Sequence, residues 1–407
     1  MILDIIDKKA NNYELTKEEL EKIFLGYLNN KVEDYQMSAF LMAIRINDMS
    51  DSEVFALTDI FIKSGEVLDL SFIDAIKVDK HSTGGVGDKT TLIVAPLVAS
   101  CSVPVIKMSG RGLGYTGGTI DKLESIPGFK VELTEEEIKK QANDIGLVIT
   151  SQTKDLAPLD KKIYALRDVT ATTNSIPLIA SSIMSKKIAG GADKIVIDIK
   201  VGNGALIKTQ KEAERLSDLL IKIGMYYQKE VKTIISDMNA PLGHNVGNKL
   251  EVLEALEVLE NKEKGPLYEL SLNLATKMVS LGKNIKEIEA QQEVLESLKN
   301  GKALNKFIEF IKYQNGNLEN LKVEAKIYNI KANKSGTLKS INAINVAKLC
   351  QSIGAGRKNK DESIDYNAGV VIRKNINEKI KEGDILATVY TNIDNQEFNI
   401  EKIFEIS

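Results

Sequence analysis

The chain has 407 residues, of which 43% are hydrophobic and 27% are charged, the composition of an ordinary globular protein. Its net charge of −3 and pI of about 5.8 lack the basic surplus that binds nucleic acids or anionic membranes. No signal peptide or long apolar segment is visible, and the two cysteines lack metal-ligand spacing, so we expect a cytoplasmic protein of two or three domains.

The N-terminal part of the chain is predicted to be helical. Thr16 and Ser50 each precede a glutamate by three residues, the pattern of a capping box at a helix start. Apolar residues recur at helical spacing over 36–46. Ser64 and Gly65 then mark a helix end, where glycine adopts the left-handed conformation without steric cost. A small all-α domain is expected here.

From about Ile76 short apolar stretches alternate with helical segments, which favours an α/β domain with a mainly parallel sheet. Strands are expected over 92–99, 103–108, 147–150, 195–201 and 232–238. Helices are expected after capping boxes at Thr134 and Thr209, and the stretch 159–188 is also helical in pattern. After Ala332, turn glycines and short apolar runs predict a β-rich C-terminal domain.

Three segments carry the residues suited to chemistry. The first reads KHSTGGVGDKTT and runs from Lys80 to Thr91. Its glycines let backbone N–H groups approach an anion closely, while Lys80, Ser82 and Thr91 add a charge and hydroxyl donors. It is not a nucleotide P-loop, because Asp88 separates the last glycine from Lys89. A structural turn is the less favoured interpretation.

The second segment, KMSGRGLGYTGGTIDKLE, runs from Lys107 to Glu124. Three of its glycines match the spacing of the dinucleotide fingerprint, a weak signal by itself that leaves a dinucleotide-dependent dehydrogenase as a rival. The hydroxyls of Ser109 and Thr119 beside backbone amides suit a small tetrahedral oxyanion better than a long pyrophosphate.

The third segment consists of YALRDV over 164–169 and SSIMSKK over 181–187. Arg167 and Lys186 are cations on apolar helical stretches, and Ser182 shares a helix face with Lys186 at i, i+4. For either cation alone, a salt bridge on the helix surface is the usual interpretation.

The chain has two histidines. A histidine whose pKa lies near neutrality can donate a proton at physiological pH, and His81 lies inside the first glycine-rich segment. His244 belongs to none of the three segments and is interpreted as structural or superficial.

Taken together, the three segments closely resemble the thymidine and pyrimidine-nucleoside phosphorylase family, and most of all its bacterial pyrimidine-nucleoside members. The resemblance implies an α/β multidomain fold in which a small all-α domain is hinged to a larger α/β domain with a mostly parallel central sheet. A C-terminal α+β domain resembling a hammerhead barrel follows, and members are homodimers. The implied domains are 1–66 with the pyrimidine-binding insertion 160–190, the phosphate-binding α/β parts 67–159 and 191–331, and 332–407.

The resemblance also implies roles for individual residues. Phosphate would be held by Lys80, Ser82, Thr91, Ser109 and Thr119. The nucleoside would contact Lys107, Leu113, Tyr164, Arg167, Ser182 and Lys186. Catalysis would use His81 as general acid at the 2-carbonyl oxygen of the base, with Arg167 and Lys186 stabilising charge on the departing ring.

The implied activity is the reversible phosphorolysis of uridine, deoxyuridine and thymidine to free base and ribose or deoxyribose 1-phosphate. Inorganic phosphate is then a substrate, and no organic cofactor is expected. Lys107 stands where broad-specificity members have lysine and strict thymidine enzymes have methionine, so a strict thymidine phosphorylase is the alternative. More distant rivals are an anthranilate-type phosphoribosyltransferase and a non-catalytic nucleoside-binding protein.

Broad-specificity bacterial members of the family often bind a monovalent cation near the phosphate loop. The corresponding locus here comprises Gly87, Leu242, Asn245 and Glu254, but Lys89 stands where those members have threonine. We expect the Lys89 ammonium to take the place of the cation and to pair with Glu254, so that potassium is not required.

Overall fold

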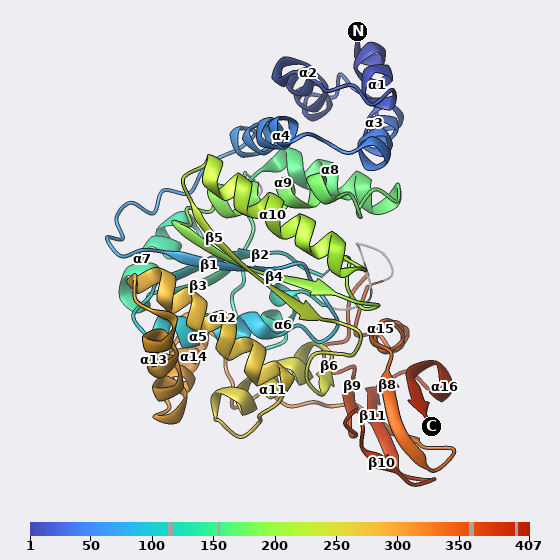
Figure 1. The fold of residues 1–407 in the computed structure, drawn as a ribbon. Coiled ribbons are helices and arrows are strands. Elements are labelled where there is room, and N and C mark those ends of the chain that lie inside the picture. The colour runs from blue at the N-terminus through green and yellow to red at the C-terminus, as the bar shows by residue number, and fades with distance from the viewer. Residues whose placement is uncertain (113–114, 116, 154, 358–361, 395–397) are drawn as a thin grey trace. The chain divides into compact units, whose positions relative to one another are not determined.

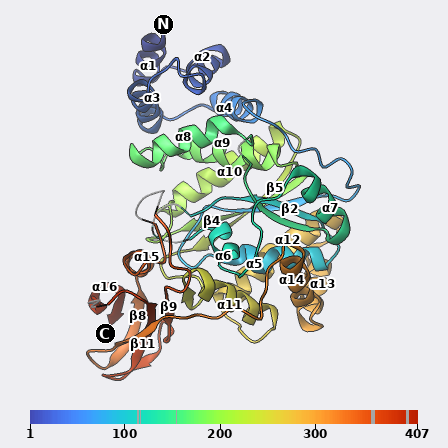
Figure 2. The ribbon, with the colours of Figure 1, turned by 180° about the vertical axis from the view of Figure 1, so that it is seen from behind.

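The computed structural model describes residues 1–112, 115, 117–153, 155–357, 362–394 and 398–407 (Figures 1 and 2). The chain forms two compact units. The first unit comprises Met1–His81, Thr153–Ile197 and Thr209–Thr233, and the second comprises Ser82–Gln152, Asp198–Lys208 and Ile234–Ser407. No helix of the described residues is long and apolar enough to cross a membrane. Both cysteines are buried free thiols.

The first unit is built mainly from helices. They are α1 (Ile2–Ala10), α2 (Lys17–Leu28), α3 (Asp34–Asn47), α4 (Asp51–Lys63), α8 (Pro158–Val169), α9 (Ile176–Ala189) and α10 (Gln210–Tyr226). The predicted capping boxes at Thr16, Ser50 and Thr209 all form, since each hydroxyl accepts a hydrogen bond from the N–H of the glutamate three residues on. Helix α9 packs against both α4 and α10, so the predicted insertion completes the N-terminal bundle.

Helix α4 ends where it was predicted to end, but for a different reason. Gly65 is not in the left-handed region, so the expected left-handed cap is wrong. A Cβ on Gly65 would lie 2.0 Å from the carbonyl oxygen of Asp155 and 2.4 Å from Cδ of Pro158. Glycine is required because two backbone segments meet there, and Glu66 N–H donates to the same Asp155 carbonyl at 2.9 Å.

The described residues of the α/β part form two sheets, whose strands alternate with helices along the chain. One sheet has the order β1-β4-β5, from β1 (Val78–Ser82), β4 (Lys194–Val201) and β5 (Glu230–Asp237). Strands β2 (Val105–Ser109) and β3 (Leu147–Ser151) pair in parallel, with Val105 opposite Leu147. The accompanying helices are α5 (Thr90–Ser100), α6 (Thr119–Glu124), α7 (Glu135–Ile145), α11 (Asn248–Leu259), α12 (Pro266–Lys283), α13 (Glu287–Lys299) and α14 (Lys302–Tyr313).

Two predictions in this part were wrong. The stretch 92–99 was expected to be a strand but lies within helix α5, whose residues from Thr90 to Ala99 are all buried. A helix buried on every side has no apolar periodicity, so a short apolar run does not distinguish it from a buried strand. Strand β1 was not predicted, because its residues from Val78 to Ser82 are mostly polar and the last three of them were assigned to the glycine-rich segment.

The C-terminal part of the second unit is β-rich, as predicted. It contains β7 (Lys326–Lys331), β8 (Gly336–Ile341), α15 (Ala343–Ser352), β9 (Gly369–Ile372), β10 (Lys379–Ile380), β11 (Ile385–Thr391), α16 (Ile400–Ile403) and β12 (Phe404–Ile406). One sheet has the order β10-β8-β12. The other has the order β6-β9-β11-β7, and its edge strand β6 (Asn245–Val246) comes from the segment before α11 (Figure 1). The C-terminal sheet is therefore joined to the α/β part by strand pairing.

Candidate active site

The first glycine-rich segment begins in a strand and ends in a helix. Lys80, which is buried, and the half-buried His81 and Ser82 are the last residues of β1. Thr91 lies in the first turn of α5. Gly84 in the connecting loop has a φ of +86°, a left-handed conformation that favours glycine. The N–H groups at the start of α5 make this end of the helix suited to an anion.

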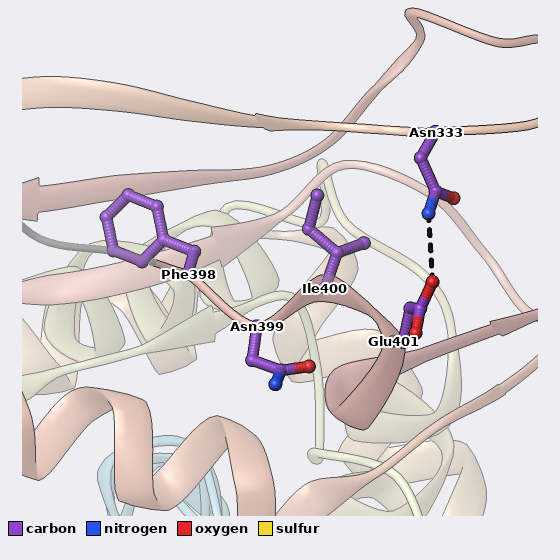
Figure 3. Close-up of a pocket in the computed structure, with 5 residues that line it drawn as sticks. All are labelled: Asn333, Phe398, Asn399, Ile400 and Glu401. Atoms are coloured by element: carbon purple, nitrogen blue, oxygen red, sulfur yellow. Dashed lines mark hydrogen bonds between the residues drawn. The ribbon is translucent and has the colours of Figure 1, made fainter.

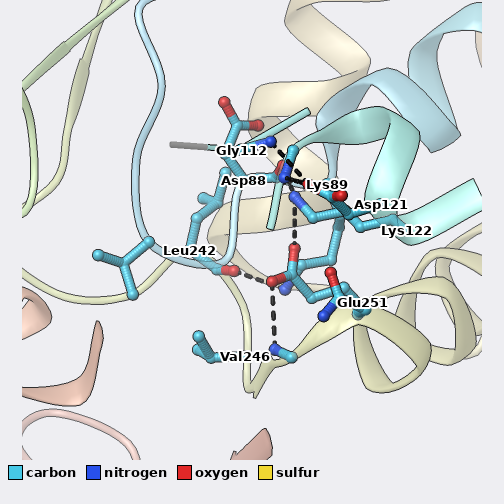
Figure 4. Close-up of polar contacts among 12 residues, drawn as sticks. Asp88, Lys89, Gly112, Asp121, Lys122, Leu242, Val246 and Glu251 are labelled. Carbon is cyan, nitrogen blue, oxygen red and sulfur yellow. Dashed lines mark hydrogen bonds and ion pairs between the residues drawn. The ribbon is translucent and has the colours of Figure 1, made fainter. Parts of the chain in front are cut away.

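Asp88 links the two glycine-rich segments (Figure 4). One carboxylate oxygen accepts a hydrogen bond from the Ser82 hydroxyl at 2.5 Å, and the other accepts from the Thr90 hydroxyl at 2.6 Å. The Asp88 carbonyl oxygen accepts from Lys122 Nζ at 2.6 Å, and the same ammonium is 2.9 Å from Glu251 Oε2. Because Lys122 lies on α6, this chain of contacts fixes the first segment against the helix that closes the second.

The second segment leads from β2 to α6. Ser109 is the last residue of β2 and Thr119 the first of α6, and Lys107 is buried within the strand. Asp121 accepts hydrogen bonds from the N–H groups of Gly112 and Gly118, at 2.7 and 2.8 Å. The predicted nucleoside contact Leu113 lies outside the described residues.

The Lys89 ammonium lies at the predicted cation locus. Its Nζ donates to the carbonyl oxygens of Leu242 and Asn245, at 2.8 and 2.7 Å, and to Glu254 Oε2 at 2.5 Å. Lys89 is 1% exposed, and a Cβ on Gly87 would be 3.4 Å from its Nζ. Three oxygen atoms that could bind a small cation therefore accept hydrogen bonds from an ammonium group supplied by the chain itself.

The predicted ring-binding residues gather in the first unit on α8 and α9. Lys186 Nζ donates to Asp160 Oδ2 at 2.7 Å and to the Ser182 hydroxyl at 2.9 Å. The Tyr164 ring centroid lies 5.8 Å from that Nζ and 5.5 Å from Cζ of Arg167. Burial raises the pKa of the Tyr164 hydroxyl, so this ring stays neutral at physiological pH.

Arg167 has a structural task as well. It is 1% exposed, and its guanidinium donates to the carbonyl oxygens of Thr172, Thr173 and Leu178 at 3.3, 2.8 and 3.2 Å. Burial lowers the pKa of the Arg167 guanidinium. Because the ordinary pKa of arginine is very high, the group remains charged. These three hydrogen bonds use three of its five N–H groups. Arg167 thus bonds backbone carbonyl oxygens, whereas Lys186 forms an ion pair with Asp160 on the neighbouring helix, so a salt-bridge role stays open for Lys186.

Most residues of the two predicted groups belong to different units. The phosphate group Ser82, Thr91, Ser109 and Thr119 falls in the second unit, but Lys80 falls in the first, because the division lies between His81 and Ser82. The predicted nucleoside contact Lys107 falls in the second unit. Tyr164, Arg167, Ser182 and Lys186 fall in the first unit.

Sequence reasoning missed the acidic residues that hold the site. Asp88, Asp121 and Asp160 were not predicted, although each lies inside or next to a segment that was. The available signal was their position: a carboxylate among glycines and hydroxyls, or on the helix that carries a predicted cation, is a candidate for orienting its neighbours. His244, the second histidine, is half-buried with Nε2 3.9 Å from Glu263.

A cavity of about 440 Å³ in the C-terminal part is lined by residues outside all three segments (Figure 3). Its lining comprises Asn333, Phe398, Asn399, Ile400 and Glu401, with the Asn333 amide donating to Glu401 at 3.3 Å. This lining offers a carboxylate and no cation, so it does not suit phosphate.

Known proteins match the chain over nearly its whole length. Residues 3–65 match the helical bundle domain of a glycosyl transferase family, residues 74–304 match its α/β domain, and residues 337–405 match the pyrimidine nucleoside phosphorylase C-terminal domain. A pyrimidine-nucleoside phosphorylase of Staphylococcus haemolyticus is 48% identical, covering 99% of this chain and 95% of the relative. Its counterpart in Bacillus subtilis is 47% identical, with the same coverage.

Among solved structures, an anthranilate phosphoribosyltransferase from Thermus thermophilus has a TM-score of 0.61. It covers 77% of this chain and 100% of its own, at 16% identity, which indicates a shared fold. The full-length relatives and all three matched domains indicate the same family. The chain belongs to the pyrimidine-nucleoside phosphorylase family.

Proposed function

We propose that this chain catalyses the phosphorolysis of uridine, deoxyuridine and thymidine to the free base and ribose or deoxyribose 1-phosphate. The observation that carries the proposal is the 48% identity to a pyrimidine-nucleoside phosphorylase over 99% of the chain. The reaction breaks the bond between N1 of the base and the anomeric carbon, and a phosphate oxygen forms the new bond from the opposite face. The chain is thus a pentosyltransferase.

The proposed phosphate site consists of Lys80, Ser82, Thr91, Ser109 and Thr119. The ends of β1 and β2 and the starts of α5 and α6 offer hydroxyl and backbone N–H donors, which suit a tetrahedral anion. The Ser82 hydroxyl donates to Asp88 in this structure, so its proton must turn from Asp88 for it to donate to phosphate.

The departing base carries negative charge on its ring and two carbonyl oxygens. Lys186 stabilises this charge as it develops, where a preorganised cation has the greatest effect on rate. His81 is the general acid towards the 2-carbonyl oxygen. Arg167 and Tyr164 complete the ring-binding side, and the buried Asp160 holds the Lys186 ammonium in place.

Substrate breadth is proposed from Lys107. A lysine at this position can donate a hydrogen bond to a ribose hydroxyl, which favours uridine as well as thymidine as a substrate. A strict thymidine phosphorylase is the second candidate. The resemblance to a phosphoribosyltransferase at 16% identity concerns the fold alone.

The protein is further proposed to work in the cytoplasm as a homodimer. Leu3, Tyr35 and Ile46 are large apolar side chains on α1 and α3 that are 58%, 73% and 73% exposed. Contact with a second copy of the chain would remove such side chains from water.

We expect purified protein to release uracil from uridine and thymine from thymidine only when orthophosphate is present. Turnover of the two nucleosides should agree within about tenfold, because they differ by one ribose hydroxyl, worth roughly one hydrogen bond, and by one methyl group on the base. Chromatography of the released base measures both rates. Cleavage of thymidine alone would favour the strict enzyme, and a requirement for magnesium and a pyrophosphorylated ribose would favour the transferase.

Replacement of His81→Ala should lower kcat by about 10²–10⁴-fold, the usual contribution of a general acid. The KM for phosphate should change much less, because the phosphate donors remain. Steady-state kinetics with either substrate varied separates the two effects. His244→Ala is the matched control and should keep normal turnover. A His81→Ala enzyme with near-normal kcat would remove this assignment.

Replacement of Lys186→Met should slow phosphorolysis at least about 10²-fold, because the ring charge loses its cation. The single change also leaves the buried Asp160 carboxylate unpaired, which lowers stability. The double variant Lys186→Met/Asp160→Asn removes both charges and should regain melting temperature but not kcat. Recovery of both would mean that Lys186 only neutralises Asp160. Arg167→Ala is unsuited to this test, since it also removes hydrogen bonds to three backbone carbonyl oxygens.

We propose that the Lys89 ammonium replaces a potassium ion, since it already donates to the oxygen atoms of that locus. Activity should therefore persist when potassium is exchanged for a tetraalkylammonium ion. A Lys89→Thr variant, which vacates the three oxygens, should become dependent on potassium, whereas Lys89→Met should not be rescued by it. The measurement is kcat of each protein in potassium chloride and in tetraalkylammonium chloride. If the wild type loses activity when potassium is exchanged, the proposal is contradicted.

A further inference from the structure

A single buried carboxylate closes the second glycine-rich segment. Asp121 is 0% exposed, and its Oδ2 accepts hydrogen bonds from Gly112 N–H and Gly118 N–H. Gly112 follows the end of β2 by three residues, and Gly118 directly precedes α6. One oxygen atom therefore holds these two positions together next to Thr119.

The loop positions around Gly112 and Gly118 pack directly against each other. A Cβ on Gly118 would lie 2.5 Å from Gly112 N and 2.7 Å from the carbonyl oxygen of Gly110. No side chain fits between them, so the closed loop depends on glycine at 118 and on a carboxylate at 121 in the correct position. A shift of Asp121 would move both positions.

The C-terminal domain holds that carboxylate. Arg357 Nη2 donates to Asp121 Oδ1 at 2.8 Å, and its Nη1 donates to the carbonyl oxygen of Gly112 at 3.4 Å. The Arg357 side chain is 12% exposed, so this ion pair is poorly screened by water. Arg111 is farther from Asp121, at 3.6 Å, and it forms a bidentate pair with Glu124 instead.

A second contact from the C-terminal domain lies beside the first. The Tyr366 hydroxyl donates to Glu124 Oε2 at 2.8 Å, and burial followed by this hydrogen bond raises the pKa of Tyr366 to about 12. Glu124 is on α6, the helix that carries Asp121. The C-terminal domain thus contacts both acidic residues on the helix that follows the loop.

We propose that Arg357 is a positioning residue for phosphate, acting from the C-terminal domain through Asp121. Its guanidinium fixes the Asp121 carboxylate and the Gly112 carbonyl, and these fix Gly112 and Gly118, which lie near Ser109 and Thr119 in the chain. This inference rests on the proposed function, in which those two hydroxyls bind phosphate. Arg357 itself contacts neither substrate.

The test compares Arg357→Ala with the matched control Arg373→Ala, which removes another arginine of the same domain. The Arg373 guanidinium bonds Thr388, away from the loop. With uridine and phosphate varied separately, Arg357→Ala should raise the KM for phosphate about tenfold or more, the effect of about one charge-assisted hydrogen bond. The KM for uridine should stay within about twofold. Arg373→Ala should match the wild type in both.

Two further measurements separate positioning from a general loss of structure. Millimolar guanidinium chloride should lower the KM for phosphate of Arg357→Ala and leave that of Arg373→Ala unchanged. Arg357→Lys keeps the charge beside Asp121 but loses the forked geometry, so it should fold normally and show a smaller rise in the KM for phosphate. This variant carries the test if Arg357→Ala does not fold.

The proposal is overturned if the KM for phosphate is unchanged in both Arg357→Lys and Arg357→Ala. It is also overturned if the KM for phosphate and the KM for uridine rise in parallel. Failure of the proposed function is a different result, because the wild type itself would then release no base in the presence of phosphate. In that event the proposal for Arg357 falls with the function on which it rests.

Discussion

The second unit depends on a lysine that has no access to water. The Lys89 ammonium is enclosed by two carbonyl oxygens and the Glu254 carboxylate, and a buried charge without such partners would be very costly. Lys89 is also the residue that precedes helix α5, so the position of its ammonium determines where that helix and Thr91 lie. Segments far apart in sequence are brought to one place by the need to solvate a single cation.

The need to pair buried charges also applies to other buried lysines of the second unit, near the proposed phosphate site. Lys89, Lys122 and Lys200 are all buried in the second unit, and each is paired with a buried carboxylate. These pairs are nearly neutral and serve to fix the backbone. In the proposed site, Lys80 is then joined by oriented hydroxyl and N–H groups, and for these neutral donors geometry matters more than charge. This explains why acidic residues such as Asp88 and Asp121 are common around a proposed anion site.

Local signals in the sequence predicted local structure well. The capping boxes, the β-rich C-terminal domain and the helical insertion over 159–188 all appear as expected, because each depends on neighbouring residues. The stretch 92–99 was misassigned because complete burial removes periodicity. The close approach at Gly65 and the contact of Arg357 with Asp121 join residues far apart in the chain. No pattern within one segment reports such contacts.

The pairing of β6 with β9 has a consequence for the newly made protein. Asn245, one acceptor for Lys89, lies in a strand whose partner contains Val371. On the ribosome, both glycine-rich segments emerge long before that partner strand, so they exist for some time without one wall of their enclosure. Because non-local pairing comes late in folding, the strand that holds this Lys89 acceptor gains its partner only after most of the chain has been made.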